Sequence, residues 1–490
     1  MKKFDRFIKL LILLLPCTLY FSYHPLIYLG SSQLMNFELS LPLIFLVIYA
    51  ISAFIYFFEN RRTLCKTCPR KIITILALFP LYATISIFWS RSPVHGFLAS
   101  GILWLIYIAV ISFVWLYRDF FADRNFAQKC LKFFIYFSLV ICGVCWLQSI
   151  LDVAGLDRTY TLLCSGCTYK IFGFPHPNGF MAEPQYLGGI LLAPTLFSLY
   201  FLLRSPSLKR GIISIIFTAT LFFTLSRGAI YAFAVAFIVL LTITIAKQKT
   251  AKPLLLIPLV LFSYLFSLNA EGLFAEFSKT DDTYFTGITK SVNQLSLGII
   301  DLSSIFPKAE PEKTESKTDS GSSLRIDDAT KPLETSTQDG YVEASTSGRL
   351  TLARASFELW RSQPNYAIFG AGIGGAGASI YHDFVDPGTQ NREDMKNLLV
   401  SAGVDIPSLN VQSEYAELLV EFGSIGIILI ALIIILILKS TKNRARTPLI
   451  ALAVAYLVAM LFCSGLTNSL YLYLYLPFFA IIMEHAKNAH

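Results

Sequence analysis

Charged residues are scarce in this 490-residue chain. Asp, Glu, Lys and Arg make up 15% of it, 55% of the residues are hydrophobic, and the mean hydropathy is +0.60. A water-soluble domain of this composition would expose more apolar surface than it could keep in solution. The scarcity of charge therefore excludes an ordinary soluble enzyme and predicts a membrane protein. The net charge of +8 then indicates orientation in the membrane rather than nucleic-acid binding.

Sequence patterns for metal ions and nucleotides are also missing. Nine cysteines include two C-x-x-C pairs, Cys65/Cys68 and Cys164/Cys167, but neither pair belongs to a four-ligand zinc spacing. The run FGAGIGGAG follows no predicted strand and lacks the Gly-Lys-Ser/Thr of a phosphate loop. It predicts a turn that brings the backbone close to the membrane domain. We expect neither a metal ion nor a cofactor.

Twelve apolar stretches dominate what is present. A helix needs about 20 apolar residues to cross a bilayer, and most of the stretches approach that length. They are residues 8–24, 39–58, 72–89, 98–117, 133–151, 186–203, 211–226, 228–246, 253–269, 423–438, 448–466 and 469–484. We expect an all-α polytopic membrane protein of about twelve transmembrane helices, the first formed by an uncleaved N-terminal segment.

Basic residues predict the orientation of these helices. If the N-terminus is cytoplasmic, the inner connecting segments hold 23 Lys and Arg residues, whereas the short outer segments hold four. The four are Arg91, Arg158, Lys170 and Arg227. Because short cytoplasmic loops carry the excess of positive charge, we expect both termini in the cytoplasm and a multi-pass location in the cytoplasmic (inner) membrane.

The chain divides into three parts. Residues 1–269 contain the first nine spans, residues 270–410 form a large extracytoplasmic loop, and residues 411–490 contain the last three spans and a cytoplasmic tail. Within the loop, 308–347 is rich in Ser, Thr, Glu and Pro, which predicts a flexible insert. The following GRLTLARASFELWRSQP predicts an amphipathic helix that ends before Pro364. The segment 409–422 predicts a helix that leads into the tenth span.

Arginines on the outer side are the first candidates for chemistry. Arg227 follows Ser226 in a tight turn between two apolar stretches, where its guanidinium can either mark a helix end or bind a phosphate group. Arg349, Arg354 and Arg361 lie on the predicted loop helix. Arg354 and Arg361 share one face and Arg349 is turned away from it. Together they can hold a diphosphate or an anionic glycan, or form a solvated face.

Acidic residues supply the candidates for a base. Glu183 lies in the apolar-flanked segment MAEPQY, and Glu414, Glu417 and Glu421 lie in the helix before the tenth span. A carboxyl group near the membrane often has a raised pKa and can then accept a proton. A charge on the helix surface is the alternative. His176, in the first outer loop, is expected at the protein surface.

Four segments together resemble the O-antigen ligase and O-antigen polymerase superfamily. They are SIFWSRSPVHGF after the third span, TLSRGAIYAF at the seventh-to-eighth turn, SGRLTLARASFELWRSQPNYAIFGAGIGG in the large loop, and SEYAELLVEFGSIGIILI at the tenth span. Their order and spacing agree with that family over most of the chain, the 308–347 insert excepted. The resemblance implies a GT-C-like membrane glycosyltransferase.

The resemblance also implies roles for single residues. The donor would be a glycan on undecaprenyl diphosphate, the acceptor a hydroxyl of a lipid or glycan, and the reaction metal-independent. Arg227 matches the arginine of the family's Ser-Arg-Gly turn and Arg349 the arginine that opens the loop helix. Both are expected to contact the diphosphate, where they would stabilise charge on the leaving group. We expect Arg91, Glu183, Arg354 and Arg361 to contribute to substrate binding.

One position departs from the family pattern. Ligases of this family carry His-Asn where this chain has Gln412 and Ser413. Glutamine can orient a hydroxyl but cannot take its proton, so Glu414 or another outer group replaces the base, or the reaction proceeds without one. The segment FMAEPQYLGG is more similar to polymerase-type members, which leaves ligase and polymerase as alternatives. A flippase of lipid-linked glycans is the alternative from another class, although no inverted repeat is apparent.

Overall fold

The computed structural model describes residues 2–22, 26–28, 38–155, 169–171, 174–181, 183–278, 283–296, 338–385, 411, 413–440, 446–462 and 470–485. Nearly all of them are helical. The helices are α1 (Lys2–Thr18), α2 (Leu41–Thr67), α3 (Arg70–Ser86), α4 (Pro93–Ile111), α5 (Arg118–Ala122), α6 (Arg124–Val153), α8 (Pro184–Arg204), α9 (Leu208–Phe223), α10 (Arg227–Gln248), α11 (Leu256–Phe277), α12 (Tyr284–Leu295), α13 (Gln338–Ser362), α14 (Pro364–Phe369), α15 (Ala376–Phe384), α17 (Glu414–Ser440), α18 (Arg446–Ala459) and α19 (Leu470–His485).

Two short antiparallel strand pairs complete the described elements. Strand β1 (Leu26–Tyr28) pairs with β2 (Glu38–Ser40), and β3 (Tyr169–Ile171) pairs with β4 (Phe174–His176). Both pairs are too small to form a core of their own. The hydrophobic core is therefore made by the helices.

Eight helical segments within the described residues are long and apolar enough to cross a membrane. Every one of the twelve predicted apolar stretches overlaps a helix, which confirms the prediction of an all-α polytopic membrane protein. Helices α1, α9, α18 and α19 have 17, 16, 14 and 16 residues, less than the roughly 20 that a full span needs. The count of twelve spans stays a prediction.

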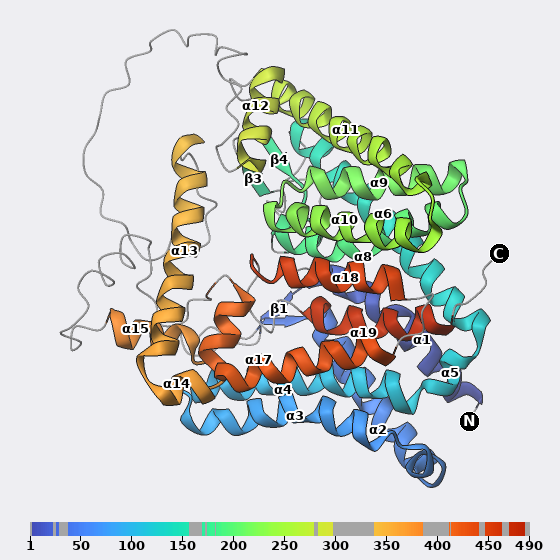
Figure 1. Ribbon diagram of the computed structural model, residues 1–490, viewed down its shortest axis with the longest axis vertical. Helices are drawn as coiled ribbons and strands as arrows, with labels where there is room; N and C mark the ends of the chain where they lie inside the picture. The colour runs from blue at the N-terminus through green and yellow to red at the C-terminus, as the bar shows by residue number, and fades with distance from the viewer. Residues whose placement is uncertain are drawn as a thin grey trace.

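The helices run side by side in two groups (Figure 1). One group contains α6 and α8 to α11, the other contains α2, α3, α4 and α17, and α18 and α19 lie between them. Helices α8 and α10 pack closely because Gly188 faces Ala229: a Cβ on Gly188 would lie 2.6 Å from the Ala229 Cβ. Small residues allow such close approach where no hydrophobic effect drives helices together in lipid.

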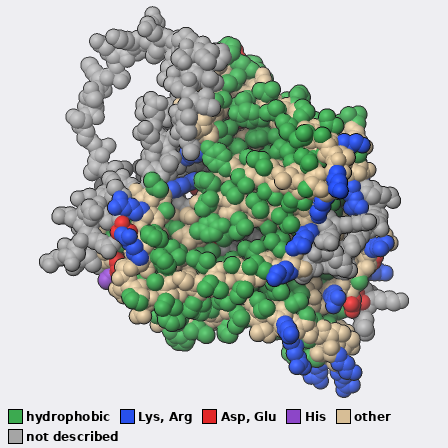
Figure 2. All heavy atoms as spheres, in the orientation of Figure 1, with side chains coloured by type: hydrophobic (Ala, Val, Ile, Leu, Met, Phe, Trp, Pro, Cys, Tyr) green, Lys and Arg blue, Asp and Glu red, His purple; other side chains and the backbone are tan. Residues whose placement is uncertain are grey.

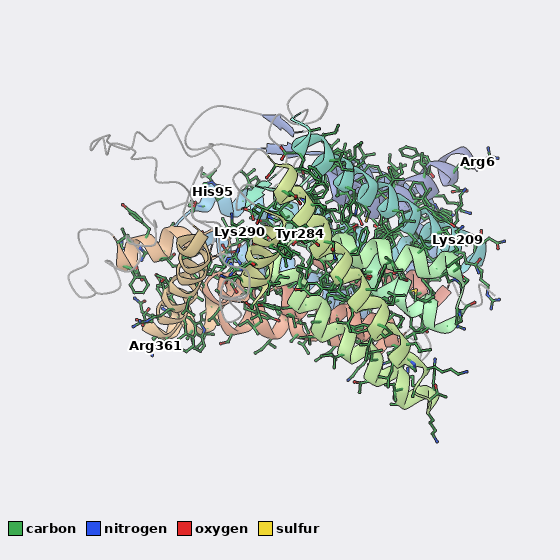
Figure 3. All side chains as sticks on the ribbon, turned by 90° about the horizontal axis from the view of Figure 1, so that it is seen from above. Arg6, His95, Lys209, Tyr284, Lys290 and Arg361 are labelled. Carbon is green, nitrogen blue, oxygen red and sulfur yellow. The ribbon has the colours of Figure 1, made fainter. Side chains whose placement is uncertain are left out.

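Charged side chains gather at the two ends of the bundle, and apolar side chains cover the belt between them (Figure 2). Arg6 and Lys209, both predicted on the cytoplasmic side, lie at one end (Figure 3). His95 and Arg361, both predicted on the outer side, lie at the other. This separation of charges agrees with the predicted orientation, which itself stays a prediction.

The loop helices lie at the second end. Helix α12 packs against α11, whereas α13 extends across the end of the bundle (Figure 1). Helix α13 ends at Ser362, just before Pro364, as predicted. Most of the predicted flexible insert lies outside the described residues. Its last ten residues, 338–347, instead form the first turns of α13, so the helix starts earlier than expected.

The glycine-rich turn after α14 inserts between α17 and the α3–α4 connection. The amide of Gly372 donates to the Glu421 carbonyl at 2.9 Å, and the amide of Ile373 donates to Ser86 Oγ at 3.0 Å. Gly370, Gly372 and Gly374 have φ of +73°, +88° and +70°, a region that side chains disfavour. The predicted close approach of this turn to the membrane domain is therefore confirmed.

Replacing Gly372 with alanine should destabilise the protein by at least about 2 kcal/mol, because the new Cβ combines a left-handed backbone with a steric clash. That Cβ would lie 2.5 Å from the Ser86 carbonyl oxygen. Gly101→Ala is the matched control, since a Cβ there meets nothing within 4 Å. Thermal unfolding in detergent should separate the two variants. Equal melting temperatures would contradict the tight fit.

Candidate active site

Arg227 is the first residue of α10 and lies at its N-terminal turn. Ser226 caps the helix by accepting a hydrogen bond from the Ala229 amide, and Arg227 is only 8% exposed. A snorkelling arginine would reach into solvent, so the burial argues against a mere helix-end marker. Gly228 lies directly against Phe462 at the end of α18, where a Cβ would come within 2.6 Å of the Phe462 Cβ. The turn is thus fixed from two sides.

Arg349 reaches a different helix, α8. Its Nη2 donates to Gln185 Oε1 at 3.2 Å, and its charge also acts on Glu183, the N-cap residue of α8. Burial raises the pKa of Glu183, and the Arg349 guanidinium partly offsets the rise. Helix α13 of the loop and helix α8 of the membrane bundle therefore interact here through the Arg349 guanidinium, the Gln185 amide and the Glu183 carboxyl group.

One turn of α8 contacts both Arg349 and the turn that contains Arg227. Gln185, the partner of Arg349, and Gly188, which packs against the Arg227 turn, are three residues apart. Residues at this spacing lie on one helix face, within about 5 Å along the axis. The helix thus presents the Arg349 contact and the Arg227 turn side by side.

The N-terminus of α17 closes the site on a third side. The Glu414 amide donates to the Met460 carbonyl at 2.9 Å, and the Tyr415 hydroxyl donates to the Leu457 carbonyl at 2.8 Å. Leu457 lies in the last turn of α18 and Met460 directly follows that helix, two residues before the Phe462 that contacts Gly228. Glu414 is therefore close in the fold to the Arg227 turn, although 187 residues separate them in the sequence.

Three carboxyl groups of α17 are buried rather than displayed on its surface. Glu414, Glu417 and Glu421 are 0%, 8% and 3% exposed. The backbone amides of Gly374 and Ala376 donate to the Glu421 carboxyl group, so this residue holds the glycine-rich turn. Glu421 has a structural role here, and Glu414 and Glu417 are the carboxyl groups nearer the start of the helix.

Other predicted residues do not join this cluster. Arg354 and Arg361 both pair with Glu358, at 3.3 and 3.8 Å, and each side chain is 59% exposed. Their shared face is confirmed, and it is a solvated one. Arg91 forms an ion pair with Asp383 at 3.2 Å and donates to the Tyr366 hydroxyl, which ties the α3–α4 connection to α14 and α15. Gln412 lies outside the described residues.

Two findings were not predicted from the sequence. Gln185 contacts Arg349 across 164 residues, and only its position beside Glu183 at a helix start could have indicated it. His176, expected at the surface, is fully buried, so that expectation was wrong. The strand pair that contains it packs against α6 and α11, which covers the imidazole.

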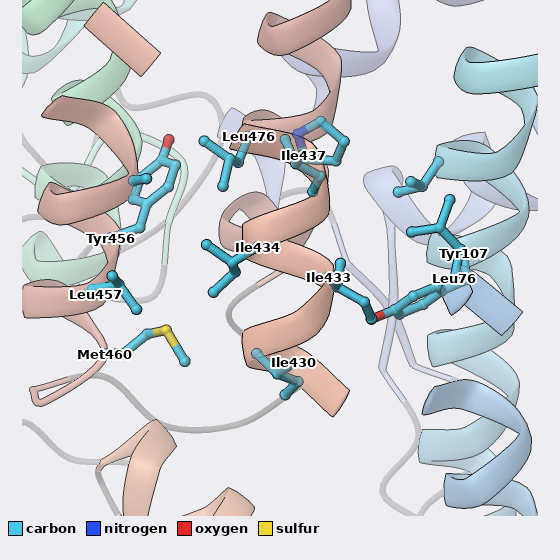
Figure 4. A pocket seen from close by; sticks show the side chains of 13 residues that line it. Leu76, Tyr107, Ile430, Ile433, Ile434, Ile437, Tyr456, Leu457, Met460 and Leu476 are labelled. Carbon is cyan, nitrogen blue, oxygen red and sulfur yellow. The ribbon is translucent and has the colours of Figure 1, made fainter. Parts of the chain in front are cut away.

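An apolar cavity of about 50 Å³ lies deeper in the bundle. Residues of α3, α4, α17, α18 and α19 line it, among them Leu76, Tyr107, Ile433, Met460 and Leu476 (Figure 4). Met460 links it to the polar cluster, because its carbonyl accepts the Glu414 amide. The polar cluster at the end of the bundle and the apolar cavity among the spans therefore share one residue, Met460.

The arrangement suits an anionic ligand. Arg227 and Arg349 provide charge, and the N-termini of α8 and α10 add backbone N–H groups and the positive ends of their helix dipoles. The start of α17 adds the buried carboxyl groups of Glu414 and Glu417. The described residues contain no cluster of three or more His, Cys, Asp or Glu residues that could hold a metal ion.

Fold and site together define a polytopic, all-helical membrane protein with an arginine-containing polar site at one end of its bundle. Residues 212–431, which are less than half of the chain, match the family described as O-antigen ligase. Members of this family are enzymes of the ligase or polymerase type. The matched region contains Arg227, Arg349 and Glu414 but neither Arg91 nor Glu183. No curated protein matches the chain.

Proposed function

We propose that the chain is a glycosyltransferase that moves a glycan from undecaprenyl diphosphate to a hydroxyl group of a lipid or glycan acceptor. The observation that carries this proposal is that Arg349 contacts Gln185 while the turn that contains Arg227 packs against Gly188, one turn further along α8. Two guanidinium groups and two helix N-termini suit a diphosphate, whose charge grows as it leaves.

The reaction is a substitution at the anomeric carbon of the donor sugar. The acceptor oxygen forms a bond to this carbon while the bond to the diphosphate oxygen breaks, and the electron pair leaves with the lipid diphosphate. Arg227 and Arg349 stabilise that leaving group. The hydroxyl proton passes to a carboxylate, for which Glu414 is our candidate because it lies close to the Arg227 turn. Gln412 would orient the acceptor. This chemistry uses protein groups alone.

Membrane orientation follows from the same proposal. Arg6 and Lys209, both in predicted inner segments, lie at the end of the bundle opposite His95 and Arg361 (Figure 3), which supports a site on the extracytoplasmic face of the cytoplasmic membrane. About twelve spans with a large outer loop, as in a GT-C-like enzyme, agree with this placement. Arg91 would keep the loop helices seated over the site through Asp383 and Tyr366.

Purified protein in liposomes tests the proposal directly. With a lipid-diphosphate-linked glycan and a hydroxyl acceptor, we expect a covalent glycan product and released lipid diphosphate. A flippase would instead move the lipid-linked glycan across the bilayer without forming product. Protein-free liposomes serve as the control for spontaneous release. Saturable movement with no product would overturn the enzymatic proposal.

Surface glycans of a deletion strain would then separate ligase from polymerase. Loss of a polymerase should leave single repeat units on the surface acceptor, whereas loss of a ligase should leave long chains on the lipid carrier. The segment FMAEPQYLGG, which contains Glu183, favours the polymerase. Comparing glycan ladders of cell surface and lipid carrier decides between the two.

A further inference from the structure

The turn that presents Arg227 contains a strained residue. Leu225 has φ of +47°, a left-handed conformation that branched side chains rarely adopt. Such a conformation persists only where the surrounding structure holds it. What holds Leu225 therefore also determines where the guanidinium of Arg227, two residues later, points.

Helix α12 holds this turn through three contacts. The Leu225 side chain is 2% exposed and packs with Ala275 of α11 and Leu295 of α12. Gln294 Nε2 donates to the Leu225 carbonyl over a long 3.5 Å. The Tyr231 hydroxyl, one turn beyond Arg227 on α10, donates to the Leu295 carbonyl. The C-terminal turn of α12 thus contacts the chain on both sides of Arg227.

Helix α12 is in turn held on α11. Gly287 lies so close that a Cβ would be 2.6 Å from the Ala275 Cβ. A carboxyl group, that of Glu271, is buried in the same interface and is 1% exposed. Ser267 Oγ donates to its Oε1 at 3.2 Å, and Ser291 of α12 faces it from the other side.

This carboxyl group has no evident reason to be buried there unless it orders the interface. Glu271 makes no ion pair among the described residues, and neither its Oε2 nor the Ser291 Oγ has a hydrogen-bond partner among them. Burying such atoms costs free energy that an apolar residue would avoid. A polar group of this kind specifies one arrangement of two helices rather than adding stability alone.

We propose that Glu271 is a positioning residue for Arg227. Its carboxyl group fixes α12 on α11, α12 holds the strained Leu225 turn, and the turn sets the place of the guanidinium. The inference rests on the proposed function for its effect on catalysis. Its first part, the seating of α12, can be measured without catalysis.

Three variants at two positions test the catalytic effect. Glu271→Leu should lower glycan transfer at least ten-fold at an equal amount of protein in the membrane, because small misplacement of a catalytic group is costly. Glu271→Gln keeps an oxygen acceptor of the same shape and should stay within about three-fold of the wild type. Glu276→Leu, at an exposed position of the same helix, is the matched control and should change nothing. Full activity of Glu271→Leu would overturn the proposal.

A double variant distinguishes positioning from general loss of structure. In an Arg227→Lys background the guanidinium is already gone, so adding Glu271→Leu should lower the rate less than two-fold further. A full additional ten-fold loss would mean that Glu271 acts independently of Arg227, which would contradict the proposal.

Thiol labelling tests the seating of α12 alone. Thr289 is 9% exposed, and its hydroxyl has no described hydrogen-bond partner, so Thr289→Cys removes no hydrogen bond. A membrane-impermeant maleimide should label this cysteine slowly in the otherwise unchanged chain and at least ten-fold faster with Glu271→Leu; the chain without Thr289→Cys gives the background. Unchanged labelling would refute the seating role. If the wild type forms no glycan product, the proposed function fails while labelling still decides this part.

Discussion

Arg227→Ala is expected to lower glycan transfer by about 10²- to 10³-fold, the usual effect of removing one group that stabilises a leaving anion. The guanidinium is buried at the first turn of α10, where few water molecules can replace it. Product formation in liposomes, at equal amounts of reconstituted protein, measures the effect. In cells the same variant should lose surface glycan while remaining in the membrane.

Arg227→Lys separates charge from geometry. Lysine keeps one positive charge but cannot offer the planar fork that binds two oxygens, so we expect an intermediate loss of about ten-fold. This variant also guards against misfolding, because alanine would leave a gap where the buried Arg227 side chain lies. Thermal unfolding of all three proteins is the control. Full glycan output from Arg227→Ala with a normal melting temperature would rule out the proposed role.

Arg349→Ala is expected to have the second largest effect, a loss of about 10²-fold in transfer rate. It removes a guanidinium that contacts Gln185 and offsets the burial of Glu183. Without that cation the pKa of Glu183 should rise further, because only burial would then act on it. The same liposome assay measures the loss of activity.

Arg361→Ala is the matched control on the same helix. Its side chain is 59% exposed and pairs with Glu358 at 3.8 Å, and exposed ion pairs contribute little. We expect a change of less than two-fold in transfer. Gln185→Ala keeps the Arg349 charge but removes its partner, so it should fall between the two. Equal losses from Arg349→Ala and Arg361→Ala would mean that the general charge of the loop, rather than the Arg349 position, supports activity.

Local patterns in the sequence were sufficient where a local rule applies. Apolar length predicted a helix at every one of twelve stretches because a chain in lipid must satisfy its backbone hydrogen bonds internally. Pro364 correctly ended α13, since proline cannot continue a helix. The glycine-rich run predicted a close backbone approach because glycine alone tolerates positive φ there. The early start of α13 was missed, because the composition of 308–347 favoured a flexible chain.

The site could be predicted only in part. Arg227 and Arg349 came from a resemblance to a family and from their place on the predicted outer side, and both lie at the end of α8. The exposure of Arg354 and Arg361 could not be predicted from the sequence. They differ from Arg227 and Arg349 mainly in which helices pack beside them, and that packing belongs to the tertiary structure. Gln185, Leu225 and Glu271 carried no signal of their own. Their contacts join helices that are distant in sequence.

The sequence by itself determined that this is a helical membrane protein and which segments can span, and its basic residues predicted an orientation. These properties depend on transfer of single residues or short segments between water and lipid, so they are additive along the chain. Only the tertiary structure decided which arginines lie against α8, which carboxyl groups are buried, and that α12 contacts the Arg227 turn. Such contacts depend on side-chain packing between distant helices, which no local pattern encodes.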